Sequence, residues 1–355
     1  MVFDYDIIVI GAGPAGANFA RLVDTRRYRV LMLDGSAGRD KVCGGLISPD
    51  AQDVLARYDL SLPREVLATP QLFSVRTVDL GNGLTRYYRR SYMNVDRRRL
   101  DDFFRGLVPD VVERAVDRCE SVTREGDGYA VVLSHRRVTC RYLIGADGAS
   151  SVVRRSLFSD HPIVRYTAIQ QWFPAKDVNP YYSCLFDSAT STGCSWIFFK
   201  DGSLIFGGAF DTHGARQAFE AQKRKLIEHG LVSAEVLAAP IRTEACTVLR
   251  PRLGGGICLG EAGCFLIGEA AGLISPSSFE GISYALCSGE ALADALNRAR
   301  DGRAALRAYQ KKTRGLARKI ALRCLKRPFM YHPILRAAVL KSGITALRIR
   351  KGDLS

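Results

Sequence analysis

The chain has 355 residues, of which 47% are hydrophobic and 25% are charged, and its formal net charge is +15. This length and composition exclude a disordered protein and favour a large core in two lobes that share one crevice. No apolar run reaches the roughly 18 to 20 residues of a membrane-spanning helix. The ten cysteines lack paired C-x-x-C spacing, and the chain enters its first strand directly. We therefore expect a cytoplasmic protein with reduced thiols and no metal site.

The first predicted element is an apolar strand over residues 6–10, followed by a glycine-rich turn and a helix at about 14–23. A second strand covers residues 29–33 and ends at Asp34. In a dinucleotide cradle, the glycines permit a tight turn, backbone approach to a pyrophosphate and close helix packing, and the acid accepts from a ribose hydroxyl. The residues predicted to form this cradle are Gly11, Gly13, Pro14, Ala15, Gly16 and Asp34. A chance glycine-rich loop is the alternative.

Two later segments narrow the choice of dinucleotide. Residues 142–154 form a strand that runs into Gly-Ala-Asp-Gly, and residues 265–273 repeat that design with Gly268 and Glu269. Here the chain resembles the flavoproteins built like para-hydroxybenzoate hydroxylase, which carry a G-A-D-G-x-x-S-x-x-R box and a G-D-A-A-G box. The resemblance implies that the cofactor is FAD.

Two further segments resemble those of one branch of these flavoproteins. Residues 41–49 and 195–200 are similar to the C-G-G and aromatic Y-x-W-x-F-P-K segments of geranylgeranyl reductases, and the likeness to the CbrA family of enterobacterial flavoproteins is closer still. The resemblance covers about residues 3–292. Glu269 replaces the usual Asp, but the longer acid should still reach the ribityl chain. Phe199 replaces the usual Pro, so the match to the aromatic segment, on which the expected substrate class depends, is incomplete at this position.

The middle of the chain is rich in predicted strands, which form an antiparallel sheet: 72–80, 85–95, 166–173, 181–187, 194–200 and 203–210. Helices are expected at about 49–58, 97–106, 215–229 and 281–299. The predicted fold class is α/β, with a Rossmann-like FAD-binding lobe, an inserted antiparallel-sheet substrate lobe and a helical C-terminal tail. We expect the FAD lobe to comprise 1–70, 96–160 and 258–300, the sheet lobe 71–95 and 161–257, and the tail 301–355.

The resemblance also implies further cofactor contacts. Arg97 matches an arginine that reaches the flavin, with a surface arginine as the alternative. Asp147 is interpreted as a cofactor ligand, with a helix-capping turn acid as the alternative. Glu269 should meet the ribityl or phosphate region. The remaining expected cofactor-binding residues are Gly44, Gly45, Gly268, Gly281 and Ile282, the last two because the helix N-terminus there would stabilise an anionic reduced ring.

Cys43 is the candidate catalytic residue, because it precedes two glycines that would pass close to a flat ring, and the reductases carry a matching cysteine. Its thiol would tune the flavin, donate a proton or only fill space. Residues on the strands of the sheet lobe are candidates for substrate contact: Gln171, Trp172, Trp196 and Phe198, with Gln170, Tyr182, Cys184 and Phe206 beside them. Alternation places only half of such residues on the crevice side.

The tail from residue 301 carries most of the excess positive charge, between apolar residues at helical spacing, with breaks expected near Pro328 and Pro333. A basic amphipathic helix suits an anionic membrane surface, so we expect peripheral attachment to the inner face of the cytoplasmic membrane. Packing of the apolar stripe on the protein's own core is the equal alternative. Nucleic acid is a poor candidate partner, because no nucleic-acid-binding motif accompanies the charge.

Three functions remain open. The first is an FAD-dependent oxidoreductase that reduces carbon–carbon double bonds of an isoprenoid or other hydrophobic small molecule, by hydride transfer from flavin N5. The second is a flavin monooxygenase that hydroxylates an aromatic or lipid-like substrate through a C4a-hydroperoxide. The third is a non-enzymatic, flavin-loaded redox sensor at a membrane surface. No second G-x-G-x-x-G follows a strand, so NAD(P)H would bind transiently, or an external donor would supply the electrons.

Overall fold

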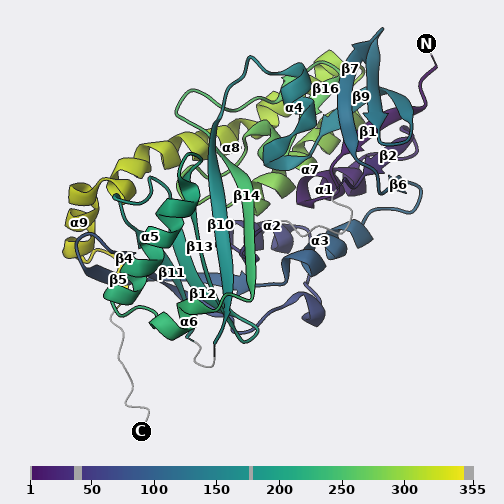
Figure 1. Cartoon of the computed structure of the whole chain (residues 1–355). Coiled ribbons are helices and arrows are strands. Elements are labelled where there is room, and N and C mark those ends of the chain that lie inside the picture. The colour runs from purple at the N-terminus through teal and green to yellow at the C-terminus, as the bar shows by residue number, and fades with distance from the viewer. Residues whose placement is uncertain (1, 36–41, 176–178, 348–355) are drawn as a thin grey trace.

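Two β-sheets organise the chain in a computed structural model that describes residues 2–35, 42–175 and 179–347 (Figure 1). The strands of the first sheet are β1 (Tyr5–Ile10), β2 (Val30–Leu33), β6 (Glu113–Ala115), β7 (Cys119–Glu125), β8 (Gly128–Leu133), β9 (Arg137–Gly145), β15 (Gly260–Glu261) and β16 (Cys264–Leu266). Their order is β15-β16-β9-β1-β2-β6, and β8 joins β7 to β9. The β16, β9, β1, β2 and β6 strands run parallel. We call this half of the molecule the Rossmann-like lobe.

Both faces of β1 are covered, which explains why its sequence is a continuous apolar run. Ile7 and Val9 pack in one core with the helices α1 (Pro14–Leu22) and α7 (Ile282–Arg298). Ile8 belongs to a second core on the other face of the sheet. The smaller helical elements are α2 (Pro49–Arg57), η1 (Arg64–Val66), α3 (Arg97–Gly106), η2 (Gly148–Ser150), α4 (Val152–Leu157) and η3 (Gly268–Ala271).

The second sheet forms the other half, which we call the sheet lobe. Its strands are β3 (Leu46–Ile47), β4 (Leu72–Asp79), β5 (Leu84–Asn94), β10 (Val164–Pro174), β11 (Tyr181–Phe186), β12 (Ser195–Lys200), β13 (Ser203–Asp211), β14 (Arg242–Arg250) and β17 (Ala346–Leu347). Their order is β14-β10-β13-β12-β11-β4-β5-β17, with β3 paired to β5. The helices α5 (Ala215–Glu228) and α6 (Ala234–Ala238) lie on one side of this sheet (Figure 1).

The predicted fold class is confirmed, with three corrections in detail. The sheet of the second lobe is not wholly antiparallel, because β11 pairs with β4 in parallel. This arrangement arises because β11 returns beside a strand from a much earlier part of the chain. The short strands β3 and β17 also join this sheet, although they lie outside the ranges expected for it. Finally, α8 (Gly302–Tyr331) continues through Pro328 and ends before Pro333.

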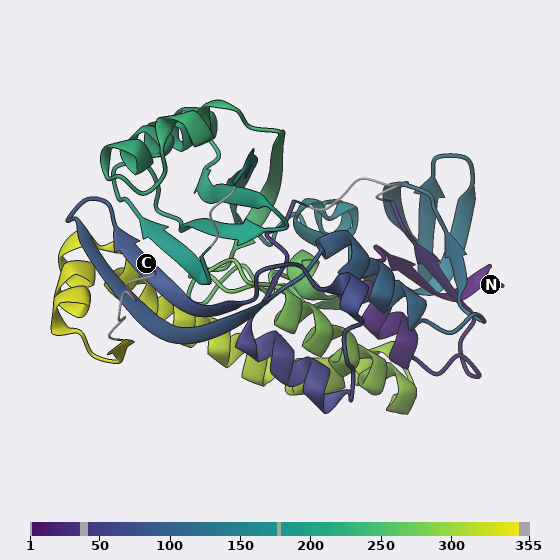
Figure 2. The ribbon, with the colours of Figure 1, turned by 90° about the horizontal axis from the view of Figure 1, so that it is seen from below.

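The long helix α8 connects the two lobes. Its inner face is buried on the Rossmann-like lobe, where the Tyr309 hydroxyl donates to the Leu266 carbonyl at 2.9 Å. At its far end, the Tyr331 hydroxyl donates to the Ser277 carbonyl at 2.5 Å. The following helix, α9 (Pro333–Ser342), lies at the end of the sheet lobe (Figure 2). The apolar stripe of the tail therefore packs on the protein's own core. These end contacts also explain why the helix tolerates Pro328, which removes an internal hydrogen bond.

Candidate active site

The three glycine-containing boxes converge at the carboxyl edge of the parallel strands. Ile10 at the end of β1 is in register with Leu33 of β2 and with Gly145 of β9, and Gly145 is in register with Leu266 of β16. The turns that follow these strands therefore meet at one edge of the sheet. In doubly wound folds, ligands bind outside this edge.

Close backbone contacts hold these turns together. A Cβ atom on Gly11 would lie 2.5 Å from the carbonyl oxygen of Ala146, and one on Gly16 would lie 1.9 Å from the carbonyl oxygen of Gly11. Gly268 has a φ of +57°, and its Cβ would lie 2.9 Å from Ala15 on the first turn of α1. These glycines are therefore required by the packing of the boxes on one another.

Gly13 differs from its neighbours, because a Cβ atom there would meet nothing within 4 Å. Gly13 is the N-cap of α1 and provides no side-chain cap, and Pro14 follows it at the first helical position. The helix N-terminus therefore presents backbone amides and a positive dipole to open space, which suits a pyrophosphate. The described residues thus fit the FAD that the sequence predicts, and Gly11, Gly13, Pro14, Ala15 and Gly16 would hold its pyrophosphate.

Two acids lie at the same edge. Asp34 follows β2 and forms an ion pair with Arg105 at 3.4 Å, with 24% of its side chain exposed. Asp147 accepts through Oδ2 from the backbone N–H of Val152 at 2.6 Å. This contact is the one expected under the alternative interpretation, in which Asp147 caps the helix that follows it. Its Oδ1 atom is buried without a hydrogen-bond partner among the described residues. Burial raises the pKa of Asp147. This Oδ1 oxygen has unused acceptor capacity, which a hydroxyl of the cofactor would satisfy.

The third box lies against α7. The amide of Gly268 donates to Ser288 at 2.9 Å, and Glu269 accepts from the amide of Leu249 at 3.0 Å. Gly281 is the N-cap of α7 and Ile282 is its first residue. An oxygen of Glu269 thus connects the Rossmann-like lobe to the end of β14. The N-terminus of α7 is a second positive helix end in the same half of the molecule.

The Cys43–Gly44–Gly45 loop lies between the two lobes. A Cβ on Gly44 would lie 3.1 Å from Phe198, and one on Gly45, where φ is +64°, would lie 2.2 Å from the Val95 carbonyl oxygen. The ammonium group of Lys200 donates to the carbonyls of Gly44 at 2.7 Å and Val95 at 2.6 Å. This lysine at the end of β12 therefore fixes the loop to the start of α3. Lys41, which precedes the loop, lies outside the described residues.

Cys43 lies near two buried cations. Burial alone would lower the pKa of Arg97, but the charge of Asp101 and a hydrogen bond to Cys43 raise it. The guanidinium and Asp101 are 3.0 Å apart, and only 10% of the Arg97 side chain is exposed. Arg97 is therefore not the surface residue of the alternative interpretation. Burial lowers the pKa of Lys200 to about 8, although the charge of a Cys43 thiolate would raise it. These cations can stabilise a thiolate at Cys43.

The inner face of the second sheet places three of the four candidate substrate residues together. Phe198 is buried in an apolar cluster against which Trp172 and Trp196 pack. The Trp196 indole donates to Gln170 at 3.2 Å, and the Trp172 indole donates to Glu244 at 3.1 Å. The polar edges of both indoles are thus satisfied inside the protein, which leaves an aromatic and apolar surface beside the Gly44 loop.

Gln171 does not join this set. Its side chain accepts from Lys223 of α5 at 3.0 Å and donates to Thr243, so it lies on the opposite face of the sheet. Phe206 also lies on that face, where it stacks on Phe219 of α5. Alternation along the strand sends neighbouring side chains to opposite faces, and the face covered by α5 cannot reach the loop. Tyr182 and Cys184 pack with the inner cluster.

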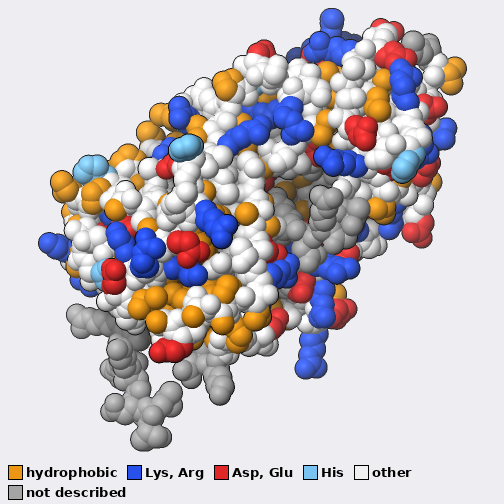
Figure 3. Space-filling model, in the orientation of Figure 1, with side chains coloured by type: hydrophobic (Ala, Val, Ile, Leu, Met, Phe, Trp, Pro, Cys, Tyr) orange, Lys and Arg blue, Asp and Glu red, His pale blue; other side chains and the backbone are white. Residues whose placement is uncertain are grey.

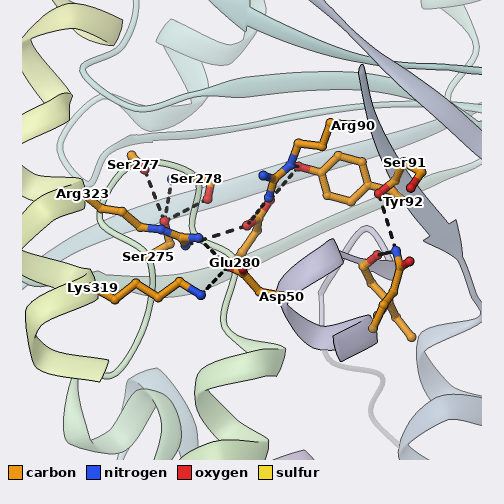
Figure 4. Close-up of polar contacts among 12 residues, drawn as sticks. Asp50, Arg90, Ser91, Tyr92, Ser275, Ser277, Ser278, Glu280, Lys319 and Arg323 are labelled. Carbon is orange, nitrogen blue, oxygen red and sulfur yellow. Dashed lines mark hydrogen bonds and ion pairs between the residues drawn. The ribbon is translucent and has the colours of Figure 1, made fainter. Parts of the chain in front are cut away.

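Glu280, directly before Gly281, forms a charged network with both lobes (Figure 4). It accepts from the Tyr92 hydroxyl at 2.6 Å and pairs with Arg90 at 3.1 Å. Burial, followed by the charge of Glu280, raises the pKa of Tyr92 well above its usual value. On the other side, Arg323 of α8 is 2.5 Å from Asp50 and 3.9 Å from Glu280. The network therefore joins β5, α2 and α8 at the start of α7.

Three residues with prominent contacts were not singled out from the sequence: Lys200, Glu244 and Glu280. Lys200 and Glu280 lie inside or next to segments that the sequence does mark, but their partners come from distant parts of the chain, and Glu244 lies on a strand that the sequence did not mark. The pairing of Gln170 with Glu244 across β10 and β14 depends on strand register, and β14 was not predicted. Knowledge of that register would have identified Glu244.

Comparisons with known proteins identify the family of the chain. The CbrA protein of Escherichia coli K12 is 41% identical over 350 residues, which cover 96% of this chain and 97% of that protein. The CbrA protein of the uropathogenic strain CFT073 has the same identity over 96% of this chain and 94% of its own length. The chain belongs to the CbrA family.

Family models place the CbrA-family chain among flavoproteins. The model of the FAD binding domain matches residues 111–323, which is more than half of the chain, and the model of lycopene cyclase proteins matches residues 6–173. This CbrA-family protein is therefore an FAD-dependent enzyme of the oxidoreductase and monooxygenase type.

Solved structures share the fold. A geranylgeranyl bacteriochlorophyll reductase-like protein from Thermoplasma acidophilum has a TM-score of 0.80 at 19% identity, over 99% of this chain and 94% of that one. PqsL of Pseudomonas aeruginosa, a probable FAD-dependent monooxygenase, has a TM-score of 0.71 at 20% identity, over 95% of this chain and 99% of that one. HpxO of Klebsiella pneumoniae, solved with FAD and uric acid, has a TM-score of 0.69 at 17% identity, over 95% of this chain and 92% of that one. Across the described ranges of this CbrA-family chain, every helix is too short or too polar to cross a membrane.

Proposed function

We propose that this flavoenzyme reduces carbon–carbon double bonds of an isoprenoid or another lipid-like molecule. The observation that carries the proposal is the inner face of the sheet lobe beside the Gly44 loop. There the half-buried Trp172 and Trp196 form an aromatic surface over the buried Phe198, and their indole N–H groups are already bonded to Glu244 and Gln170. Such a surface favours a substrate without polar groups at the reacting carbons, because it offers few unsatisfied partners.

Bound FAD, once reduced, supplies a hydride from N5. The chain has to orient the double bond, exclude water and supply a proton to the second carbon. We assign the proton to the Cys43 thiol. One carbon of the double bond receives the hydride, the other receives the Sγ proton, and the π bond breaks. Arg97 and Lys200 stabilise the thiolate that remains, and solvent returns its proton.

The electron donor is also part of the proposal. Only one G-x-G-x-x-G follows a strand in the sequence. We therefore propose that NAD(P)H binds transiently, or that a separate redox protein reduces the flavin. Stopped-flow reduction of the FAD-loaded protein by NADPH distinguishes them, because a direct donor gives a rate that rises with NADPH concentration and a separate protein donor leaves the flavin oxidised.

Anaerobic single turnover tests the proposed reaction. The reduced, FAD-loaded protein is mixed with a polyprenyl lipid, and flavin absorbance is followed without oxygen. We expect reoxidation and a product heavier by two hydrogen atoms. A flavin that stays reduced until oxygen enters, followed by a product that contains one oxygen atom from labelled O₂, would refute the reductase.

A monooxygenase is the second candidate, and the likeness to PqsL favours it. The same apolar surface would bind an aromatic or lipid-like substrate, and molecular oxygen would be the co-substrate. The labelled-oxygen experiment above separates the two reactions. In the monooxygenase case, Cys43 has no proton to deliver to carbon, so a Cys43→Ala variant should keep most of its substrate turnover.

A further inference from the structure

The C-terminal helices expose an unusual concentration of large apolar side chains. Sixteen large hydrophobic residues are exposed in the described part of the chain, and eight of them fall within residues 322–347. They are Leu322, Leu325, Phe329, Ile334, Leu335, Val339, Ile344 and Leu347. Figure 3 shows hydrophobic side chains along the edge of the molecule that α8 and α9 form. Concentrated exposed apolar side chains mark interaction surfaces.

The outer face of α8 combines this apolar surface with positive charge. Spacings of three and four residues place seven exposed side chains on one stripe, opposite the buried Tyr309 and Ile320. In chain order they are Arg307, Lys311, Arg314, Arg318, Leu322, Leu325 and Phe329. The stripe is therefore cationic along its first half and apolar along its second. The packing of the inner face does not account for these outer residues.

The apolar end of this surface is held in a defined position. Arg336 of α9 donates to both oxygens of Asp79, at 2.8 and 3.0 Å, and both side chains are almost fully buried. The strand β17 pairs with β5 just beyond α9. Ile334 and Val339 are thus 72% and 44% exposed on an anchored helix. We call the outer stripe of α8 and the outward residues of α9 the tail surface.

The charge of the tail identifies its partner. Residues 301–347 contain twelve lysines and arginines but only one acid, Asp301. Four of these cations pair with acids from elsewhere in the chain, and the four cations of the α8 stripe are not among those four. We infer that the tail surface docks on an anionic lipid bilayer, with Leu325, Phe329 and Ile334 in the interface and the cations over the headgroups. A second copy of the chain is a poor fit, because each copy carries a net charge of +15 and the two would repel. This inference does not depend on the proposed reaction.

Vesicle sedimentation with the full-length, FAD-loaded protein tests the inference. Vesicles of phosphatidylcholine alone are compared with vesicles that contain about 30 mol% phosphatidylglycerol. The triple variant Leu325→Ser, Phe329→Ser, Ile334→Ser removes apolar side chains that are 55%, 54% and 72% exposed. The matched control is Val111→Ser, Val116→Ser, Ile241→Ser, at 69%, 74% and 65% exposure away from the tail.

We expect the wild-type protein and the control to bind anionic vesicles at least about tenfold more strongly than neutral ones. The tail triple variant should lose at least about tenfold in binding. Arg314→Gln with Arg318→Gln should weaken binding roughly fivefold per charge, and salt should abolish that difference. Equal binding by wild type and the tail triple variant would overturn the inference. The inference would also be overturned if the wild-type protein bound neither type of vesicle and sedimented as a dimer, while the tail triple variant sedimented as a monomer.

Discussion

Arg336 donates through Nε and a terminal nitrogen to the two carboxylate oxygens of Asp79, at 2.8 and 3.0 Å, and joins α9 to the end of β4. Only 3% of the arginine side chain and none of the aspartate side chain is exposed. Breaking a buried pair leaves one charge without compensation, so Asp79→Asn should lower the free energy of unfolding by about 3 kcal/mol. Chemical denaturation measures this loss. The double variant Asp79→Leu, Arg336→Met should recover part of it.

The same pair has a predictable pH dependence. Burial alone would raise the pKa of Asp79, but the hydrogen bonds from Arg336 lower it below the ordinary value of 3.8. The stabilisation is therefore complete above pH 4 to 5 and is lost as the pH falls through the lowered pKa. The difference in unfolding free energy between wild type and Asp79→Asn should shrink below about pH 4. A difference that stays constant down to pH 3 would contradict this account.

Gly13 and Gly16 should respond differently to the same substitution. A methyl group on Gly13 enters open space, whereas one on Gly16 would lie 1.9 Å from the Gly11 carbonyl oxygen. Gly13→Ala should change the stability of the FAD-free protein by less than about 0.5 kcal/mol and weaken FAD binding by at least tenfold. Gly16→Ala should lower stability by several kcal/mol. Calorimetric unfolding and flavin fluorescence titration test both expectations, and equal FAD affinity of wild type and Gly13→Ala would exclude the pyrophosphate position.

Lys200 gives a second pH-dependent prediction, in which stability also rises with pH but over a more alkaline range. Burial lowers its pKa from 10.5 to about 8 in the folded protein. The unfolded chain therefore holds one more proton between pH 8 and 10, and folding stability rises with pH there by up to about 1.4 kcal/mol per unit. Lys200→Met should remove this rise. Urea unfolding at pH 7.5 and 9.5 measures it, with Lys223→Met on the other face of the sheet as the matched control.

Cys43→Ser should separate chemistry from cofactor binding. A serine hydroxyl is a much weaker acid than a thiol, so flavin reoxidation by an alkene substrate should slow by at least about a hundredfold. FAD affinity should stay within about threefold of the wild-type value, because the backbone of the loop is held by Lys200. Cys246→Ser is the control, since its thiol contacts the Val42 carbonyl at 3.6 Å beside the same loop. Equal slowing of both variants would indicate a structural effect.

Local sequence was sufficient for the three nucleotide-binding boxes, but not for β6, β7 and β8 of the same lobe, which were not predicted. Each box is a contiguous strand followed by a turn, and its glycines are required by contacts with the other boxes, as Gly11 is by Ala146. The order of the boxes therefore predicted where the strands would end. Helix α3 has the predicted bounds, because Asp96 caps it through the amide of Arg99.

The choice of sheet face could not be predicted in the same way. Alternation indicates that Gln170 and Gln171 point to opposite faces, but only the position of α5 decides which face meets the Gly44 loop. The roles of Lys200 and Glu280 likewise depend on contacts across more than 100 residues of sequence. The helical path through Pro328 depends on anchors beyond the helix, such as the bond from Tyr331 to Ser277.

The pairing of β1 with β9 and of β9 with β16 also has a consequence for biosynthesis. The strand made first obtains one neighbour about 130 residues later, and the strand beyond that is made about 120 residues later again. During translation β1 can pair with β2 early, but its other edge stays unpaired until residue 145 leaves the ribosome, and the far edge of β9 waits until residue 266. Long-range pairing of this kind is slow and exposes strand edges. The nucleotide lobe therefore completes its sheet only after most of the sheet lobe has been made, and chaperones that bind apolar segments should engage its open edge during synthesis.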